Sequence, residues 1–241
     1  MPVTGPHRHR WVRRHGAVVR VTHWINLACL AVLLPSGLQI FNAHPALYWG
    51  QASDFAHPLL SLGDGFPDWM TLPGEGWLAM GRRWHLAFAW LLVANGAAYL
   101  AWGLAGGHLW RDLVPSRADL AGIGRTIVHH LRLRFPKGAE AEHYNVLQKL
   151  AYLGVIAGLL PAMVLAGMAM SPGLDAALPW LLDLFGGRQS ARTIHFAIAA
   201  LLVAFVVVHV AMVVLSGPWN SLRSMITGRY AIDEEDDQHG P

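Results

Sequence analysis

A chain of 241 residues with 54% hydrophobic and only 14% charged residues is too apolar for an ordinary soluble domain, and indicates a membrane protein. The net charge of +3 is modest, and basic residues beside a membrane surface account for it without nucleic acid. The single cysteine, Cys29, excludes a disulfide within the chain, a CxxCH haem-attachment site and a cysteine metal cluster. Any cofactor must therefore be held by other side chains.

Four apolar segments are long enough to cross a bilayer, which needs about 20 mostly apolar residues. They lie near 22–42, 84–105, 146–170 and 194–216. We expect an all-α, four-helix transmembrane bundle that forms one domain over residues 1–230, followed by an acidic C-terminal tail at 231–241. Pro35 and Pro161 fall inside the first and third segments, where we expect kinks and not breaks.

The basic residues predict the orientation, because Lys and Arg favour the cytoplasmic side of short loops. Of the 18 Lys and Arg residues, 14 flank the N-terminus, the second loop and the C-terminus. The sequence thus predicts a multi-pass protein of the bacterial inner membrane, with both termini in the cytoplasm and the loops 43–83 and 171–193 outside. The basic amphipathic stretch "LAGIGRTIVHHLRLRF" is predicted to lie along cytoplasmic lipid headgroups.

Four of the 14 histidines lie inside or at the edge of the predicted spans. His195 and His209 are fourteen residues apart on one helix, which gives a rise of about 21 Å and an angular offset of about 40°. They point the same way at opposite depths. Their positions across the membrane place His85 beside His195 in the outer half, and His23 beside His209 in the inner half. Two such pairs from different helices are what two bis-histidine haems b require.

An arginine stands three residues before three of these histidines, in "RVTH", "RRWH" and "RTIH". Residues at this spacing share a helix face. Arg20, Arg82 and Arg192 are therefore candidates to bind haem propionates, because a guanidinium suits a carboxylate. The alternative is that they only mark the helix ends at the membrane surface.

The predicted third helix opens with polar residues at the depth of the inner pair. Tyr144, Asn145, Gln148 and Lys149 are candidates to line a quinone pocket, and Lys149 is also a candidate propionate partner. The alternative is an N-cap formed by Asn145 and a lysine that only follows the positive-inside rule.

Four glycines, Gly37, Gly96, Gly158 and Gly167, lie inside the spans. They either make room for a flat macrocycle or simply permit close helix contact.

The sequence resembles the prokaryotic cytochrome b561 and Ni-hydrogenase cytochrome b family over nearly all of residues 15–230. The likeness rests on "RVTHWIN", "GRRWHLAFAWL", "YNVLQKLAY" and "RTIHFAIAALLVAFVVVHV". Within this family it is most similar to the thiosulfate-reductase-type cytochrome b subunits, which are membrane anchors of molybdopterin oxidoreductases. The long segment "FNAHPALYWGQASDFAHPLLSLGDGFPDWMTLPGEGW" is similar to that subgroup, and its length suits a docking or capping role.

The resemblance implies that the four histidines bind two haems b, and that electrons pass between a quinone and a partner protein. We therefore expect an electron-transfer subunit, with a periplasmic redox subunit of the molybdopterin class docked over His85 and His195. The quinone is expected near His23 and His209.

Two other functions are compatible with intramembrane histidines. One is a stand-alone dihaem quinone oxidoreductase that acts on a small oxidant such as superoxide. The other is a transporter or proton channel, since intramembrane histidines also occur in proton relays. The sequence has no membrane-buried carboxylate to support the second alternative.

Overall fold

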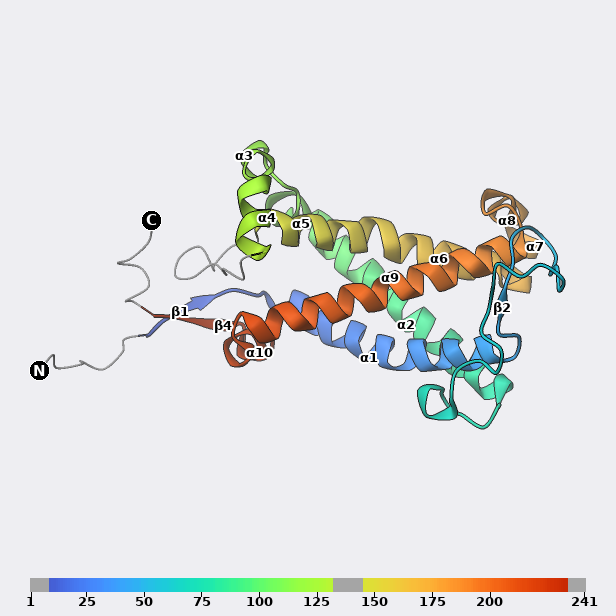
Figure 1. Ribbon diagram of the computed structural model, residues 1–241. Coiled ribbons are helices and arrows are strands. Elements are labelled where there is room, and N and C mark those ends of the chain that lie inside the picture. The colour runs from blue at the N-terminus through green and yellow to red at the C-terminus, as the bar shows by residue number, and fades with distance from the viewer. Residues whose placement is uncertain (1–8, 132–144, 234–241) are drawn as a thin grey trace, which may run out of the picture. The chain divides into compact units, whose positions relative to one another are not determined.

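The computed structural model describes residues 9–131 and 145–233, and most of them are helical (Figure 1). Within these ranges, four helical stretches are long and apolar enough to cross a membrane: α1 (Ala17–Asn42), α2 (Leu78–Ala105), Val146–Ala169, and α9 (Arg188–Leu215). The prediction of an all-α membrane protein with four transmembrane helices is confirmed. Three of the helices begin five or six residues before the predicted spans, because arginine is a good helix former and helical hydrogen bonds do not need apolar side chains.

The third stretch is not a uniform α-helix. It consists of α5 (Val146–Leu153), the π-helix η4 (Gly154–Leu159) and α6 (Leu160–Ala169). Pro161 is the second residue of α6, two positions after the last residue of the π-helix, and proline has no N–H with which to continue the helical hydrogen bonding. The irregularity expected at Pro161 is thus a change of helix type, whereas Pro35 lies inside the continuous helix α1.

Shorter elements connect these helices. They are β1 (His9–Arg13), β2 (Ala46–Leu47), β3 (Leu60–Ser61), η1 (Asp68–Met70), η2 (Leu109–Leu113), α3 (Arg117–Ala121), α4 (Ile123–Leu131), α7 (Pro172–Ala177), α8 (Pro179–Leu184), α10 (Pro218–Thr227) and β4 (Arg229–Asp233).

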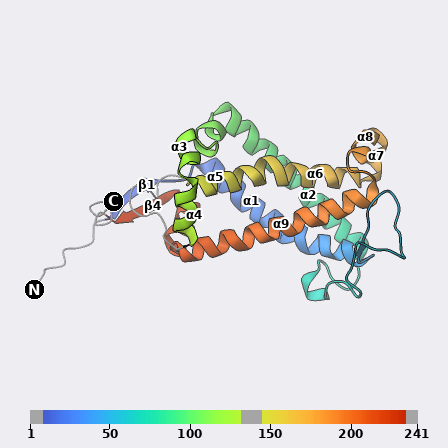
Figure 2. The ribbon, with the colours of Figure 1, turned by 45° about the horizontal axis from the view of Figure 1, so that its top comes forward.

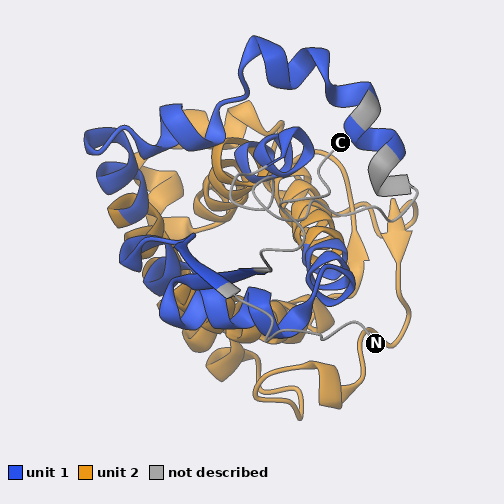
Figure 3. Cartoon of the chain, turned by 90° about the vertical axis from the view of Figure 1, so that its left-hand side faces the viewer, with its two compact units in different colours: residues 1–23, 99–154, 206–241 blue, residues 24–98, 155–205 orange. Residues whose placement is uncertain are grey.

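The chain divides into two compact units (Figure 3). Unit 1 contains residues 1–23, 99–154 and 206–241, and unit 2 contains residues 24–98 and 155–205. The long helices α1, α2 and α9 each contribute residues to both units. His23 and His209 belong to unit 1, and His85 and His195 belong to unit 2, so each predicted histidine pair lies within one unit.

In unit 2, the segment between α1 and α2 is fixed to the helices by hydrogen bonds. The side chain of Asn42, the last residue of α1, bonds both the N–H and the carbonyl of Phe66, at 2.8 and 2.7 Å. The short strands β2 and β3 pair antiparallel within the segment. The carbonyl of Gly50 accepts hydrogen bonds from two N–H groups in the first turn of α9, those of Gln189 and Ser190. These N–H groups have no partner within their own helix, so the loop supplies the cap.

Gly187 makes this contact possible. Its φ is +113°, and a Cβ there would lie 2.6 Å from the backbone of Gly50. Only glycine satisfies both conditions.

Also in unit 2, α7 and α8 pack against the end of α6 (Figure 2). The buried residues here are Ala169 of α6, Leu181 of α8 and Ala191 of α9, and methionine, leucine and phenylalanine side chains pack against them.

In unit 1, the two ends of the described chain are hydrogen-bonded to each other. β1 pairs antiparallel with β4, with His9 opposite Asp233 and Arg13 opposite Arg229 (Figure 2). The Arg14 guanidinium lies 4.7 Å from the centre of the Tyr230 ring, which adds a cation–π contact to the pairing. Residues 234–241 of the predicted acidic tail lie outside the described residues.

The predicted interfacial stretch begins as a helix. Residues 123–131 form α4, on which the apolar side chains of Ile127 and Val128 are exposed. The rest of that stretch lies outside the described residues, and its location at the headgroups stays a prediction.

Candidate functional site

The structure brings the intramembrane histidines together in the same two pairs that their depths predict. In unit 1 the ring centres of His23 and His209 are 6.3 Å apart, with 54° between the ring planes. In unit 2 the ring centres of His85 and His195 are 6.2 Å apart, with 63° between the planes. We refer to them as the unit-1 pair and the unit-2 pair. All four rings are half-buried.

These separations fit two imidazoles that bind one metal from opposite sides. A metal–imidazole bond is about 2 Å long and the bound nitrogen lies about 1.1 Å from its ring centre, so the two centres are expected about 6.2 Å apart. Across residues 9–131 and 145–233, no group of three or more His, Cys, Asp or Glu side chains is placed to hold a metal ion. A bare ion would lack ligands, whereas a haem brings four nitrogens of its own and needs only two axial ligands.

The unit-2 pair is oriented by the same arrangement on both sides. His85 rests against Gly37 of α1, and its Nδ1 lies 3.2 Å from the carbonyl oxygen of Leu33. His195 rests against Gly167 of α6, and its Nδ1 lies 3.0 Å from the carbonyl oxygen of Met163. In each case the carbonyl belongs to the residue four positions before the glycine.

Glycine is needed here because a helical side chain covers the turn that precedes its own Cα. A side chain at Gly37 or Gly167 would hide the carbonyl that the histidine reaches. Since a carbonyl only accepts, the Nδ1–H of each ring must donate to it, which leaves Nε2 as the nitrogen available to a metal. We call each glycine and the carbonyl it exposes a glycine notch. Gly96 and Gly158 have open space where a Cβ would be, and are not part of a notch.

Arg20 lies near the unit-1 pair, one turn before His23. Its Nη1 donates to the carbonyl of Ile226 at 2.5 Å, while its Nε is buried and has no hydrogen-bond partner among the described residues. A buried N–H without an acceptor is costly, and a carboxylate such as a propionate is the acceptor that suits it. Burial, together with the charges of Arg14, His23 and Arg20, lowers the pKa of the nearby His15 to about 4, so His15 is neutral at pH 7.

The other two predicted propionate partners are placed differently. Arg82 is exposed. Arg192 donates to the carbonyls of Ala46 and His44, at 2.7 and 2.5 Å, and next to it Thr193 donates to the carbonyl of Tyr48 at 2.6 Å. In the described structure the Arg192 guanidinium therefore holds the loop onto α9.

The candidate quinone residues take part in local structure. Asn145 and Gln148 form a capping box at the start of α5. Lys149 donates to the carboxylate of Asp119 at 2.8 Å. The Lys149 hydrogen bond, followed by bonds from Ser116, lowers the pKa of Asp119 to about 2. Tyr144 lies outside the described residues, and the quinone and propionate roles stay predictions.

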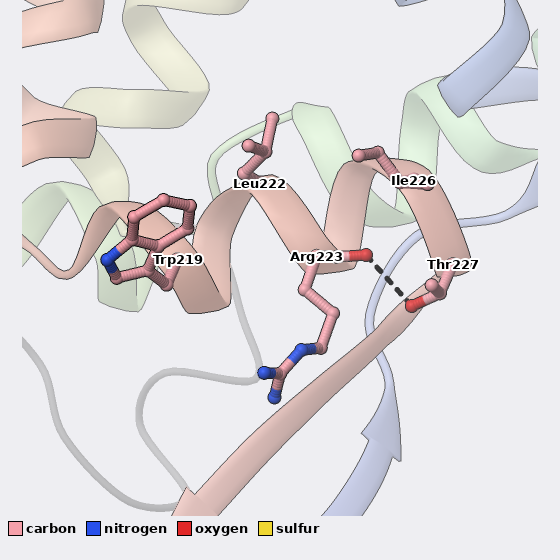
Figure 4. Close-up of a pocket in the computed structure, with 5 residues that line it drawn as sticks. All are labelled: Trp219, Leu222, Arg223, Ile226 and Thr227. Carbon is pink, nitrogen blue, oxygen red and sulfur yellow. Dashed lines mark hydrogen bonds between the residues drawn. The ribbon is translucent and has the colours of Figure 1, made fainter.

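A pocket of about 330 Å³ lies in unit 1 on the surface of α10 (Figure 4). It is lined by Trp219, Leu222, Arg223, Ile226 and Thr227, none of which is a predicted site residue. Trp219, Leu222 and Ile226 are exposed on one face of the helix, as in helices that lie in a membrane interface. The pocket is thus part of an amphipathic surface.

The sequence did not predict the groups that contact Nδ1 of His85 and His195. The carbonyls of Leu33 and Met163 carry no signal in side-chain identity, although the glycines four residues later do. Ser36 was also missed. Its hydroxyl lies 3.2 Å from Nδ1 of His85, and its position next to Gly37 in a membrane helix was the available sign.

Four apolar helices and two facing pairs of histidines define a membrane b-type cytochrome. The chain belongs to the prokaryotic cytochrome b561 family, whose model matches residues 14–228. Members of this family bind haem b and take part in electron transfer.

Two relatives are informative. The chain is 35% identical over 201 residues to a protein of Azospira oryzae named as protein-methionine-sulfoxide reductase subunit YedZ1, with 83% of this chain and 90% of the relative covered. It is 24% identical over 226 residues to a protein of Cupriavidus necator named as a Ni/Fe-hydrogenase B-type cytochrome subunit, with 90% and 81% covered. Both names describe subunits of redox enzymes. The predicted family and the multi-pass membrane class are confirmed.

Proposed function

We propose that the chain is the dihaem b membrane subunit of a redox complex, and that it carries electrons between the quinone pool and a periplasmic redox subunit. The observation that supports this most is the geometry of the two histidine pairs, each with ring centres 6.2–6.3 Å apart and each formed by two different helices. The lopsided distribution of basic residues supports an inner-membrane location with both termini in the cytoplasm.

In this function the residues of the chain would bind and orient the haems. His85 and His195 would hold one haem, and His23 and His209 would hold the other. When bound, a bis-histidine haem b accepts and releases single electrons. The glycine notches fix the rotation of the unit-2 rings and their tautomer, and the buried Nε of Arg20 offers a charged hydrogen bond to a propionate in unit 1.

We place the quinone near the unit-1 pair, on the cytoplasmic side. Asn145, Gln148 and Lys149 remain the candidates to contact it. Because Lys149 already pairs with Asp119, its use by a quinone would require exchange of that ion pair.

We place the redox partner at the loop between α1 and α2. The loop exposes Trp49, Phe55 and Trp69, with 64%, 76% and 83% of each residue accessible. It also carries four acidic residues and no Lys or Arg between positions 43 and 81. Its bonds to Asn42 and α9 hold the loop backbone at Phe66 and Gly50, and a loop that is already ordered lowers the entropic cost of binding. The resemblance to anchors of molybdopterin enzymes favours a partner of that class, and the name of one relative describes a reductase subunit.

The deciding experiment is a haem count with single-histidine variants. The purified protein should hold two non-covalent, low-spin haems b per chain. Alanine at His85 or His195 should remove one spectral and redox component, and alanine at His23 or His209 should remove the other. His57→Ala is the matched control, because that side chain is 84% exposed, and it should keep both haems.

Several outcomes would contradict the proposal. One haem per chain, or haem that stays covalently attached after acid-acetone extraction, would contradict the stoichiometry. Loss of the same component in the His23 and His195 variants would contradict the pairing. A redox subunit that co-purifies supports the partner, whereas full reaction of the isolated chain with superoxide would favour the stand-alone alternative.

A further inference from the structure

The two histidines of unit 2 differ in what surrounds Nδ1. Nδ1 of His195 lies near one acceptor, the carbonyl of Met163 at 3.0 Å. Nδ1 of His85 lies 3.2 Å from the carbonyl of Leu33 and also 3.2 Å from the hydroxyl oxygen of Ser36. Ser36 is completely buried, and a polar side chain buried in a membrane helix needs a reason.

The hydrogen bonds of Ser36 fix its direction. Its oxygen lies 2.6 Å from the carbonyl of Val32 and 3.2 Å from that of Leu33. Both carbonyls only accept, so the single hydroxyl proton is donated to the backbone of α1. The lone pairs of the Ser36 oxygen are then left for the imidazole. When Nε2 of His85 binds a metal, Nδ1 carries the proton, and the Ser36 oxygen accepts a hydrogen bond from this N–H group.

We propose that Ser36 is a positioning residue that acts through His85 and lowers the midpoint potential of the haem at the unit-2 pair. A second acceptor at Nδ1–H makes the imidazole a more basic ligand, and a more basic ligand stabilises the oxidised iron. Ser36 adjoins Gly37, against which the same ring rests, so two consecutive residues of α1 set both the place and the basicity of His85. This inference rests on haem binding by the unit-2 pair.

The test is a redox titration of the full chain, purified with its haems, as wild type and as Ser36→Ala. Loss of one hydrogen bond should shift the oxidised-to-reduced equilibrium of the unit-2 haem about threefold to tenfold toward the reduced form. For a one-electron couple this is a rise of about 30–60 mV. The unit-2 component is identified beforehand as the one that His195→Ala removes.

Thr22→Ala is the matched control. Thr22 lies in the same helix and its hydroxyl makes the same two kinds of bond to the backbone, at 2.8 Å to Val18 and 3.2 Å to Val19. It belongs to unit 1, so its replacement should leave the potential of the unit-2 haem unchanged.

An unchanged unit-2 potential in Ser36→Ala, with both haems retained, overturns the inference, as does an equal shift in Thr22→Ala. If Ser36→Ala loses the unit-2 haem, Ser36→Cys decides, because a thiol is similar in size and a weaker acceptor. A smaller shift in the same direction then supports the inference, and no shift overturns it. A wild-type protein without haem would instead refute the proposed function.

Discussion

Replacing Gly167 tests the glycine notch, because the methyl group of Gly167→Ala would meet the ring of His195. The new Cβ would lie 3.6 Å from Nδ1 and only 3.3 Å from Cε1, and the second distance is shorter than the ordinary contact of about 3.5–4.0 Å for carbon. The ring must therefore move by a few tenths of an ångström. The 3.0 Å bond from Nδ1 to the carbonyl of Met163 then lengthens toward the limit at which hydrogen bonds lose most of their strength.

A hydrogen bond of this kind contributes about 0.5–1.5 kcal/mol, so its weakening should change the redox equilibrium of the unit-2 haem by up to about tenfold. The direction is toward the reduced form, because His195 becomes a poorer donor to the iron. Gly167→Leu is the stronger perturbation. Its longer side chain would cover the carbonyl of Met163 altogether. We therefore expect loss of the unit-2 haem, which leaves one haem per chain.

The assay is the haem count per chain together with a redox titration. Gly173→Ala is the control, because Gly173 lies in α7 and has open space at its Cβ position. It should behave as wild type. Two haems with unchanged potentials in Gly167→Leu would refute the reasoning, since the carbonyl would then be irrelevant to how His195 is held.

Three further predictions concern other parts of the chain. Arg20→Gln should lower the potential of the unit-1 haem, because a cation near a propionate favours the reduced form; a titration that shows no shift would argue against this contact. The low pKa of Asp119, about 2 against an ordinary 3.8, means that its ion pair with Lys149 stabilises the fold above pH 4 and is lost as the pH falls toward 2. Thermal unfolding should therefore show Asp119→Asn less stable than wild type at pH 7, by up to about 1 kcal/mol, with the difference shrinking below pH 4; a difference independent of pH would contradict the pairing. Trp69→Ser should slow electron transfer to the redox subunit without loss of haem, while Trp219→Ser, on the equally exposed α10, should not; equal rates in both would move the docking site elsewhere.

The four spans could be predicted from the sequence because lipid demands about 20 apolar residues in a row, a requirement that any fold of the chain must meet. The approach of His85 to His195, and of His23 to His209, followed from depth alone, since alternate helices run in opposite directions. Helix ends were less predictable. α1 and α9 continue through Arg20 and Arg192, because hydropathy reports the position of lipid and not where helical hydrogen bonding begins.

Contacts between distant parts of the chain could not be predicted. Arg192 is a candidate propionate partner because it shares a helix face with His195, and the sequence did not indicate that its guanidinium binds the carbonyls of His44 and Ala46, about 150 residues earlier. Backbone acceptors have no signature in residue identity, so no spacing rule could have indicated them. Lys149 is a similar case, because its partner Asp119 lies in a different helix.

The pairing of β1 with β4 has a consequence for how the protein is made. β1 is synthesised long before its partner strand β4, which is complete only at residue 233. Until β4 has been made, β1 is thus a strand without its partner, and His23 likewise lacks its partner until His209 has been made. Unit 2 contains no residue beyond 205, so both members of its histidine pair, His85 and His195, are made before His209. If each pair holds one haem, a chain stalled once residue 205 has emerged from the ribosome should hold one haem, whereas the second haem requires His209.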